Sequence, residues 1–135
     1  MQTTKTIDWR TATDAEKNVA VAEHVAGWKD FGPGSPAYQI HYGVSVMCGF
    51  QLGSVSSIVP DYLHDADAVI ALLEKASKAR QLITDGIWFD KMGAYWTYEG
   101  HIPGADTDPL LITSASFCEP SCIALLRANG VEVIE

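Results

Sequence analysis

Histidine and aspartate side chains occur together at two places in the sequence, where they could bind a divalent cation. They are His64, Asp65 and Asp67 near the middle of the chain, and His101, Asp106 and Asp108 further along. Imidazole and carboxylate groups are suitable ligands for such an ion if folding brings them together. Aspartates at the beginning of a helix usually cap that helix, however, and loop aspartates are usually solvated. We therefore expect no metal ion and no other cofactor.

Two cysteines four residues apart, Cys118 and Cys122, are the other candidates for chemistry. On a helix this spacing puts both thiols on one face, where they could serve a metal ion or a redox pair. A nucleophilic mechanism would join Ser116 or Cys118 to His101 and a carboxylate. No G-x-S-x-G sequence accompanies these residues, and no phosphate-binding glycine loop is present. Because free cysteines are commonly core residues, we expect both to be buried, and the sequence does not indicate an enzyme.

Aromatic residues are concentrated between residues 88 and 98 and are the best candidates for a binding surface. They are Trp88, Tyr95, Trp96 and Tyr98. Adjacent residues of a strand point to opposite faces of the sheet, so one of these side chains faces away from the core unless both faces are covered. Aromatic side chains are the usual anchors of protein interfaces. The predicted interaction residues are Tyr95, Trp96, Tyr98, Glu99, Asp106 and Asp108.

The longest predicted helix covers residues 60–80. Its apolar residues recur at helical spacing, and basic residues occupy its last turns, where they suit the helix dipole. We expect Asp65 or His64 to be its cap. Everything else in the chain is expected to pack against the apolar face of this helix.

Two further helices are predicted from the same capping motif. Residues 13–27 and 116–129 each contain a Ser or Thr followed three residues later by Glu, which is the spacing of a capping box. The pairs are Thr13 with Glu16 and Ser116 with Glu119. Gly27 and the Asn129-Gly130 pair are expected to end these two helices.

Strands are predicted from alternation and turn residues. Residues 38–52 alternate apolar with small or polar residues, as in a half-buried strand or a bent pair of strands. Asp85-Gly86 predicts a turn, and residues 87–98 predict a hairpin that turns at residues 91–93. The last five residues are expected to form a short edge strand. Together these elements predict one α+β domain over residues 1–135, with an antiparallel sheet sandwiched between α-helices in helix/sheet/helix layers.

Composition and charge restrict the choice of function. The chain has 135 residues and a net charge of -8, which does not favour a protein that binds nucleic acid directly. Neither a membrane-spanning segment nor a signal peptide is expected, and three cysteines do not suggest a disulfide framework. These features predict a cytoplasmic protein with an acidic surface that could meet a basic partner.

The order of four segments resembles the phage ABA sandwich domain family. The segments are A-E-H-V-A-G-W-K at residues 22–29, P-D-Y-L-H-D-A-D-A-V-I-A-L-L-E-K at residues 60–75, the two tryptophan-bearing strands, and S-F-C-E-P-S-C-I-A-L-L-R-A-N-G-V at residues 116–131. The family typically has Ser and Thr where this chain has Leu63 and His64, and a shorter connection than residues 38–58.

This resemblance implies a small bacteriophage or prophage protein with helices on both sides of a sheet. It implies no activity and assigns no catalytic residue. Phage accessory proteins of this size often inhibit host defence, including CRISPR systems, so the expected partner is a host protein, bound on a basic surface such as one that binds nucleic acid. The alternatives are a small-molecule or metal-binding pocket near residues 100–109, and a self-associating phage structural protein that forms a homo-oligomer.

Overall fold

The chain contains three helices and several short strands among its described residues. The structure is a computed structural model, which describes the side chains of residues 5–27, 61–104 and 108–135. Between residues 40 and 58 it describes the backbone of four short strands alone. The elements are β1 (Lys5–Asp8), α1 (Asp14–His24), β2 (Ile40–His41), β3 (Val44–Ser45), β4 (Cys48–Phe50), β5 (Ser56–Ile58), α2 (Ala66–Lys78), β6 (Ile83–Asp90), β7 (Tyr95–His101), β8 (Leu110–Ser114), α3 (Cys118–Ala128) and β9 (Val131–Ile134).

The strands form one larger and three smaller sheets. Strands β6, β7 and β8 make an antiparallel sheet in that order, while β1 and β9 pair in parallel. The pairs β2–β3 and β4–β5 are antiparallel, and β2, β3 and β4 lie in the segment predicted to be a strand or a bent pair of strands, whereas β5 follows it. The mixed α+β class and the antiparallel sheet are therefore confirmed.

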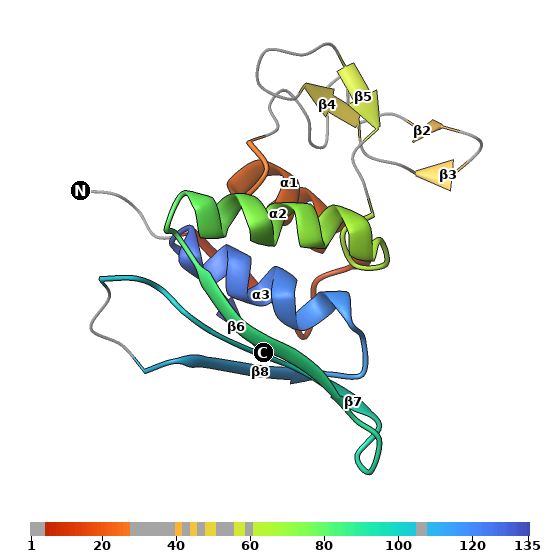
Figure 1. The fold of residues 1–135 in the computed structure, drawn as a ribbon. Coiled ribbons are helices and arrows are strands. Elements are labelled where there is room, and N and C mark those ends of the chain that lie inside the picture. Colours follow the sequence, from red (N-terminus) through yellow and green to blue (C-terminus); the bar gives the residue numbers. More distant parts are fainter. Residues whose placement is uncertain are drawn as a thin grey trace.

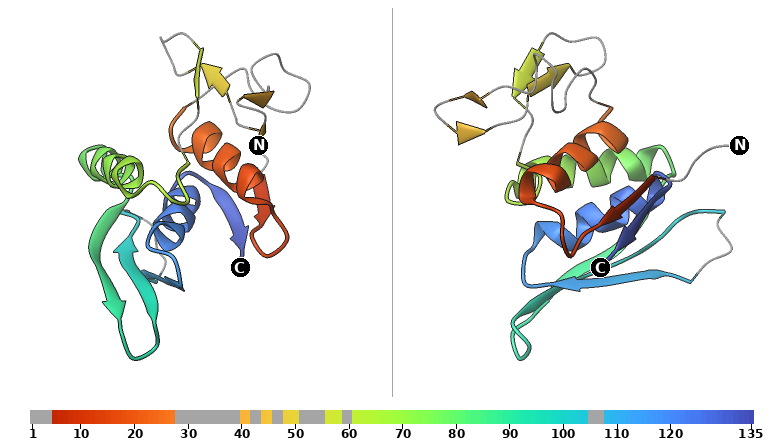
Figure 2. Two further views of the ribbon diagram at one scale, coloured as in Figure 1. Left: turned by 90° about the vertical axis from the view of Figure 1, so that its right-hand side faces the viewer. Right: turned by 180° about the vertical axis from the view of Figure 1, so that it is seen from behind.

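Helix α3 is at the centre of the molecule (Figure 1). It is buried almost all round, from Cys118 through Leu126 except for Glu119, because it packs on the three-stranded sheet on one side and on α1 and α2 on the other. Figure 2 shows the same order of layers from the side, with the described helices on one face of the sheet. Since α3 needs apolar neighbours in every direction, the helices gather around it rather than dividing between the two sheet faces.

The face of the sheet toward α3, which we call the inner face, is apolar. Strand register aligns Ile87, Tyr98 and Ile112 across the three strands, and Tyr98 and Ile112 are almost completely buried. Gly100 lies on this face as well. A Cβ atom there would come within 2.6 Å of the Ile83 carbonyl oxygen, so only glycine fits beside the β6 backbone.

Helix α2 confirms the predicted central helix, although it begins at Ala66 rather than near residue 60. The Asp65 carboxylate accepts a hydrogen bond from the Ala68 N–H and caps it, as predicted. The preceding residues instead form a turn in which the amides of His64 and Asp65 donate to the Asp61 carbonyl. Val69, Leu73 and Ala76 make up its buried face.

The predicted hairpin is confirmed, but the predicted turn at Asp85-Gly86 is wrong. Both residues lie inside β6, where the register with β7 shifts between Thr84 and Gly86 in a β-bulge. A bulge uses the same permissive glycine as a turn and leaves the strand continuous. The chain turns at residues 91–94, and the Asp90 carboxylate holds this turn by accepting hydrogen bonds from two amides.

Three strands were not predicted, and one predicted strand pairs unexpectedly. Strands β1, β5 and β8 were missed because each is short and lacks a clear alternating pattern in the sequence. The predicted final strand is confirmed as β9, but it pairs in parallel with β1, from Lys5 opposite Val131 onwards. The two ends of the described chain therefore lie side by side (Figure 2).

Candidate interaction surface

The face of the three-stranded sheet away from α3, which we call the outer face, has no described helix over it. Alternation along the strands places Trp88, Thr97, Glu99, Leu111 and Thr113 there. Trp88 is 42% exposed and Leu111 is 63% exposed, both high values for large apolar side chains. The Trp88 ring lies over Gly86, where a Cβ atom would be 3.6 Å from it. The outer face therefore presents apolar surface to its surroundings.

Further apolar surface lies at the end of the β6–β7 hairpin, which projects beyond the helices (Figure 1). Phe89 is about half exposed, and Met92 in the turn is 92% exposed. The rings of Phe89, Trp96 and Phe117 pack in a row, the first pair tilted and the second edge to face, with centroids 5.1 Å and 4.9 Å apart. This row ties the hairpin to the beginning of α3, so the hairpin has a fixed base.

The predicted interaction residues do not all lie on one surface. Tyr98 is 0% exposed, lies in the core and makes a 3.1 Å hydrogen bond with the Thr84 hydroxyl, so it offers nothing to a partner. Burial raises the pKa of Tyr98. Trp96 is on the inner face, in the ring cluster just described, and is partly buried.

The other predicted residues are closer to the outer face. Glu99 is paired with Leu111 across β7 and β8, and Asp108 is exposed just before β8. The Tyr95 hydroxyl bonds the Asp90 carboxylate, which raises the pKa of Tyr95. Hydrogen bonds from the Gly93 amide and from Tyr95 lower the pKa of Asp90. Asp106 lies outside the described residues.

Leu111 is the surface residue that the sequence interpretation missed. No strand was predicted over residues 110–114, so the alternation that exposes Leu111 was not recognised. The run of apolar residues after Pro109 was the available signal. Trp88 belonged to the predicted aromatic set but was not among the predicted interaction residues.

The surroundings of the outer face are acidic. Among the described residues between 81 and 114, the acidic ones are Asp85, Asp90, Glu99 and Asp108, and Lys91 is the one lysine or arginine. The carboxylate of the bulge residue Asp85 is hydrogen-bonded to the His101 imidazole across the two strands, at 3.0 Å. An apolar face with an acidic margin is thus the most distinctive surface of this sheet.

The two predicted groups of metal ligands do not converge. His64 bonds Asp61 at 2.9 Å, Asp65 caps α2, and His101 bonds Asp85. Within residues 5–27, 61–104 and 108–135, no three histidine, cysteine or acidic side chains are placed to hold one ion. His64 and His101 are instead each paired with one carboxylate.

The cysteines are core residues, as predicted. Cys118 and Cys122 are both buried and unpaired by any disulfide. The Cys122 thiol donates a 3.5 Å hydrogen bond to the Tyr62 carbonyl, and burial raises the pKa of both thiols. A thiol that stays protonated is a poor nucleophile, so neither cysteine has the environment of a catalytic one.

A cluster around Glu119 is the main polar feature that the sequence interpretation missed. The Glu119 carboxylate accepts hydrogen bonds from the Trp9 indole at 2.6 Å, from Ser114 at 2.9 Å and from Lys17 at 3.2 Å. The Lys17 ammonium also lies 4.7 Å from the Trp9 ring centroid. Burial alone would raise the pKa of Glu119, but these donors outweigh it and the pKa is lowered. The cluster joins the end of β1, α1, β8 and α3.

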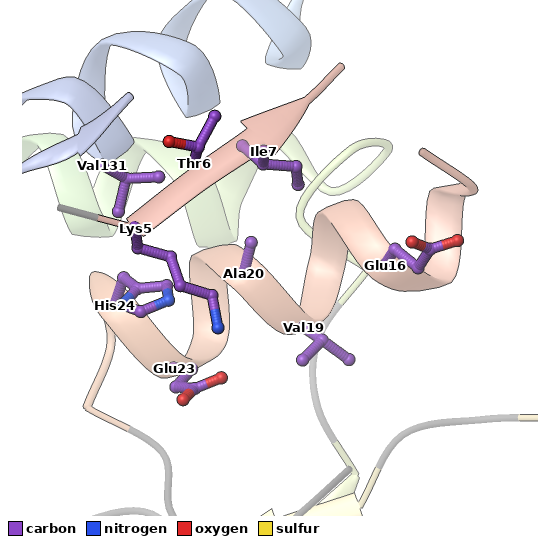
Figure 3. A pocket seen from close by; sticks show the side chains of 9 residues that line it. All are labelled: Lys5, Thr6, Ile7, Glu16, Val19, Ala20, Glu23, His24 and Val131. Atoms are coloured by element: carbon purple, nitrogen blue, oxygen red, sulfur yellow. The ribbon is translucent and has the colours of Figure 1, made fainter. Parts of the chain in front are cut away.

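A pocket of about 260 Å³ lies between β1 and α1 (Figure 3). Ile7, Val19, Ala20 and Val131 give it an apolar lining, and the polar side chains at its margin come from both elements. A second pocket of about 220 Å³ lies where α1, α2 and α3 end. His101 lines neither pocket, so these cavities do not correspond to the predicted site near residues 100–109.

None of the described helices has the length and apolar character required to cross a membrane. Comparisons with protein-family models, with curated proteins and with solved structures find no match to this chain.

Proposed function

We propose that this protein works by binding another protein through the outer face of its three-stranded sheet. The observation that carries this proposal is the exposure of Trp88 and Leu111 on a face that no described helix covers. Apolar and aromatic side chains of this kind usually provide the central contacts of an interface. Met92, in the turn at the end of the hairpin, is exposed as well, while Phe89 belongs to the inner face.

The partner is a protein with a basic surface. The outer face has an acidic margin, and the whole chain carries a net charge of -8. Complementary charge accelerates the encounter of two proteins and selects among partners, even where it adds little affinity. A nucleic-acid-binding surface on the partner is the most common source of such positive charge.

The biological setting rests on the resemblance to the phage ABA sandwich family. The order of the four sequence segments supports a phage accessory protein that binds a host protein in the bacterial cytoplasm. Inhibition of host defence, including CRISPR systems, is the specific form of this proposal. No family model matches the chain, so family membership remains a prediction.

Affinity capture with three forms of the tagged protein tests the proposal. The wild type is compared with a Trp88→Ser/Leu111→Ser variant, in which the apolar contacts are removed, at low and at moderate salt in a bacterial lysate. The matched control is Ile70→Ser, because Ile70 is also an exposed apolar residue but lies on α2. We expect a stoichiometric protein to be captured by the wild type and the control and lost from the double variant. Capture that is equal in all three forms would contradict an interface on the outer face.

Charge reversal tests the electrostatic part separately. Glu99→Lys and Asp108→Lys are each expected to weaken binding several-fold and to reduce its sensitivity to salt, because each removes an attraction that salt screens. The Glu74→Lys variant is the control, since Glu74 is acidic and exposed but lies on α2 and not on the sheet. Binding that responds to neither salt nor charge reversal would eliminate the basic partner while leaving the apolar interface.

A further inference from the structure

The two outer strands of the three-stranded sheet differ in how their free edges are protected. Natural edge strands usually carry charges, bulges or a covering element that prevents them from pairing with another chain. Strand β6 has all three. It carries Asp85 and Asp90, it contains the bulge between Thr84 and Gly86, and it contacts α2.

Strand β8 has neither the charges nor the bulge. Its five residues, Leu110–Ser114, include no ionisable side chain, and its register with β7 runs without a shift over five residue pairs. In the part of the chain that the structure describes, no strand pairs with β8 on the side away from β7. Its exposed side chains are Leu111 and Thr113, and threonine is among the residues that favour strands.

The small parallel sheet does not share this property. Strand β1 carries Lys5 and Asp8, and β9 carries Glu132. The guanidinium group of Arg127 donates a 3.0 Å hydrogen bond to the Val133 carbonyl, which occupies one backbone acceptor of β9. Among the strands whose side chains are described, the uncharged edge is therefore specific to β8.

We propose that β8 is a dimerisation edge that pairs with β8 of a second copy of this chain. Two copies can pair antiparallel about a two-fold axis at Ile112, which makes the contact self-complementary. In this register Leu111 lies opposite Thr113 of the second copy, and Leu110 lies opposite its Ser114. A chain of net charge -8 repels its own copy over most of its surface, and β8 allows contact with no like charges opposed.

The pairing would join the two sheets into one sheet with six strands. Both α3 helices would lie on the same side of it, because the two-fold axis at an antiparallel strand pair keeps the inner faces together. The two outer faces would also be continuous, so that the exposed Leu111 side chains of both copies come close to each other. The dimer therefore presents about twice the apolar surface of one copy on a single face.

Sedimentation equilibrium of the purified full chain, from low micromolar to near-millimolar concentration, tests the proposal. We expect the mass to rise from that of a monomer to that of a dimer. A Leu111→Lys/Thr113→Lys variant and a Leu111→Glu/Thr113→Glu variant are each expected to raise the dissociation constant about tenfold or more, because they place like charges directly opposite each other. Circular dichroism shows whether they stay folded, which the exposure of both positions favours.

Mixing the two variants distinguishes edge pairing from other contacts. The lysine variant and the glutamate variant should form a one-to-one heterodimer that neither forms alone, because residue 111 of one copy lies opposite residue 113 of the other. Trp88→Lys is the control on the outer face and should leave the dimer intact. A wild type that stays monomeric throughout, a mixture that does not associate, or a dimer broken by Trp88→Lys would each overturn the proposal. The first of these would leave an extended peptide of another protein as the occupant of the edge.

Discussion

The beginnings of α1 and α3 contain the same sequence motif and use it differently. At α1, the Thr13 hydroxyl accepts a hydrogen bond from the Glu16 amide, and the Glu16 carboxylate accepts one from the Thr13 amide, so the predicted capping box forms. At α3, the helix begins at Cys118 with Phe117 as its N-cap, and no side chain caps it. The predicted box of Ser116 and Glu119 is therefore wrong.

The comparison indicates when the capping-box spacing predicts a real cap. Glu16 is exposed, so the nearest groups it can bond are those of its own helix end. Glu119 is only 26% exposed, and a carboxylate in that position needs several donors to replace water. Trp9, Lys17 and Ser114 supply them from other elements. A capping box is worth about 1 kcal/mol, whereas several bonds to a charged group are worth more, so the tertiary arrangement prevails.

The largest effect is expected when the Glu119 carboxylate is removed. Glu119→Ala should lower the free energy of unfolding by about 2–4 kcal/mol, because Trp9, Lys17 and Ser114 lose their acceptor in a partly buried site. Glu16→Ala should cost only about 0.5 kcal/mol. Urea unfolding followed by circular dichroism measures both. Equal effects of the two substitutions would contradict the distinction drawn between them.

The pH dependence of stability gives a second test of Glu119. Its pKa in the folded protein is lowered from the ordinary value of 4.5. A carboxyl group of this kind stabilises the fold fully above its unfolded pKa, and the contribution is lost as the pH falls through its lowered folded pKa. The difference in unfolding free energy between wild type and Glu119→Gln should therefore shrink from about pH 5 downwards. A difference that stays constant down to about pH 3 would show that the carboxylate charge is not responsible.

A smaller effect is expected when the indole N–H is removed. Trp9→Phe keeps most of the apolar ring but deletes the 2.6 Å hydrogen bond to Glu119, and should cost about 1–2 kcal/mol. In a double-mutant cycle with Glu119→Gln, the double variant should lose less unfolding free energy than the two single variants together, with a coupling of about 1 kcal/mol. Strict additivity would mean that the indole and the carboxylate stabilise the fold independently.

The smallest effects compare the two capping residues themselves. Thr13→Ala should lower the free energy of unfolding by about 1 kcal/mol, because the Glu16 amide loses its acceptor. Ser116→Ala, at the matching position of the other motif, should change it by less than about 0.5 kcal/mol, because that hydroxyl caps nothing. Reversal of this order in urea unfolding would indicate that α3 uses the box after all.

Short-range features of the fold could be predicted from the sequence. The capping of α1 and of α2, the hairpin turn, and the end of α3 at Gly130 with its positive φ of 82° all depend on residues within four or five positions. The hydrogen bonds in these features join neighbouring residues and therefore depend on the local backbone conformation. The buried cysteines were likewise predicted from the common behaviour of the residue type.

The candidate surface could be predicted only in part. Aromatic residues in the hairpin indicated where a surface was, but alternation cannot say which of the two faces is covered. Only the position of α3 decides that Tyr98 lies in the core while Trp88 and Leu111 are exposed. The bulge at Gly86 adds one residue to β6 and so changes which side chains face outward beyond it.

The helices, their exposed caps, the hairpin and the acidic balance could all be predicted from the sequence, because each follows from neighbouring residues or from composition. Only the tertiary structure decided the parallel pairing of β1 with β9, the partners of Glu119, and the face of the sheet left open. The first two depend on contacts between residues about a hundred positions apart, such as Trp9 and Glu119, and the third depends on how α3 packs on the sheet. The free energy of such contacts comes from burial and charge pairing in the assembled core, which no local pattern records.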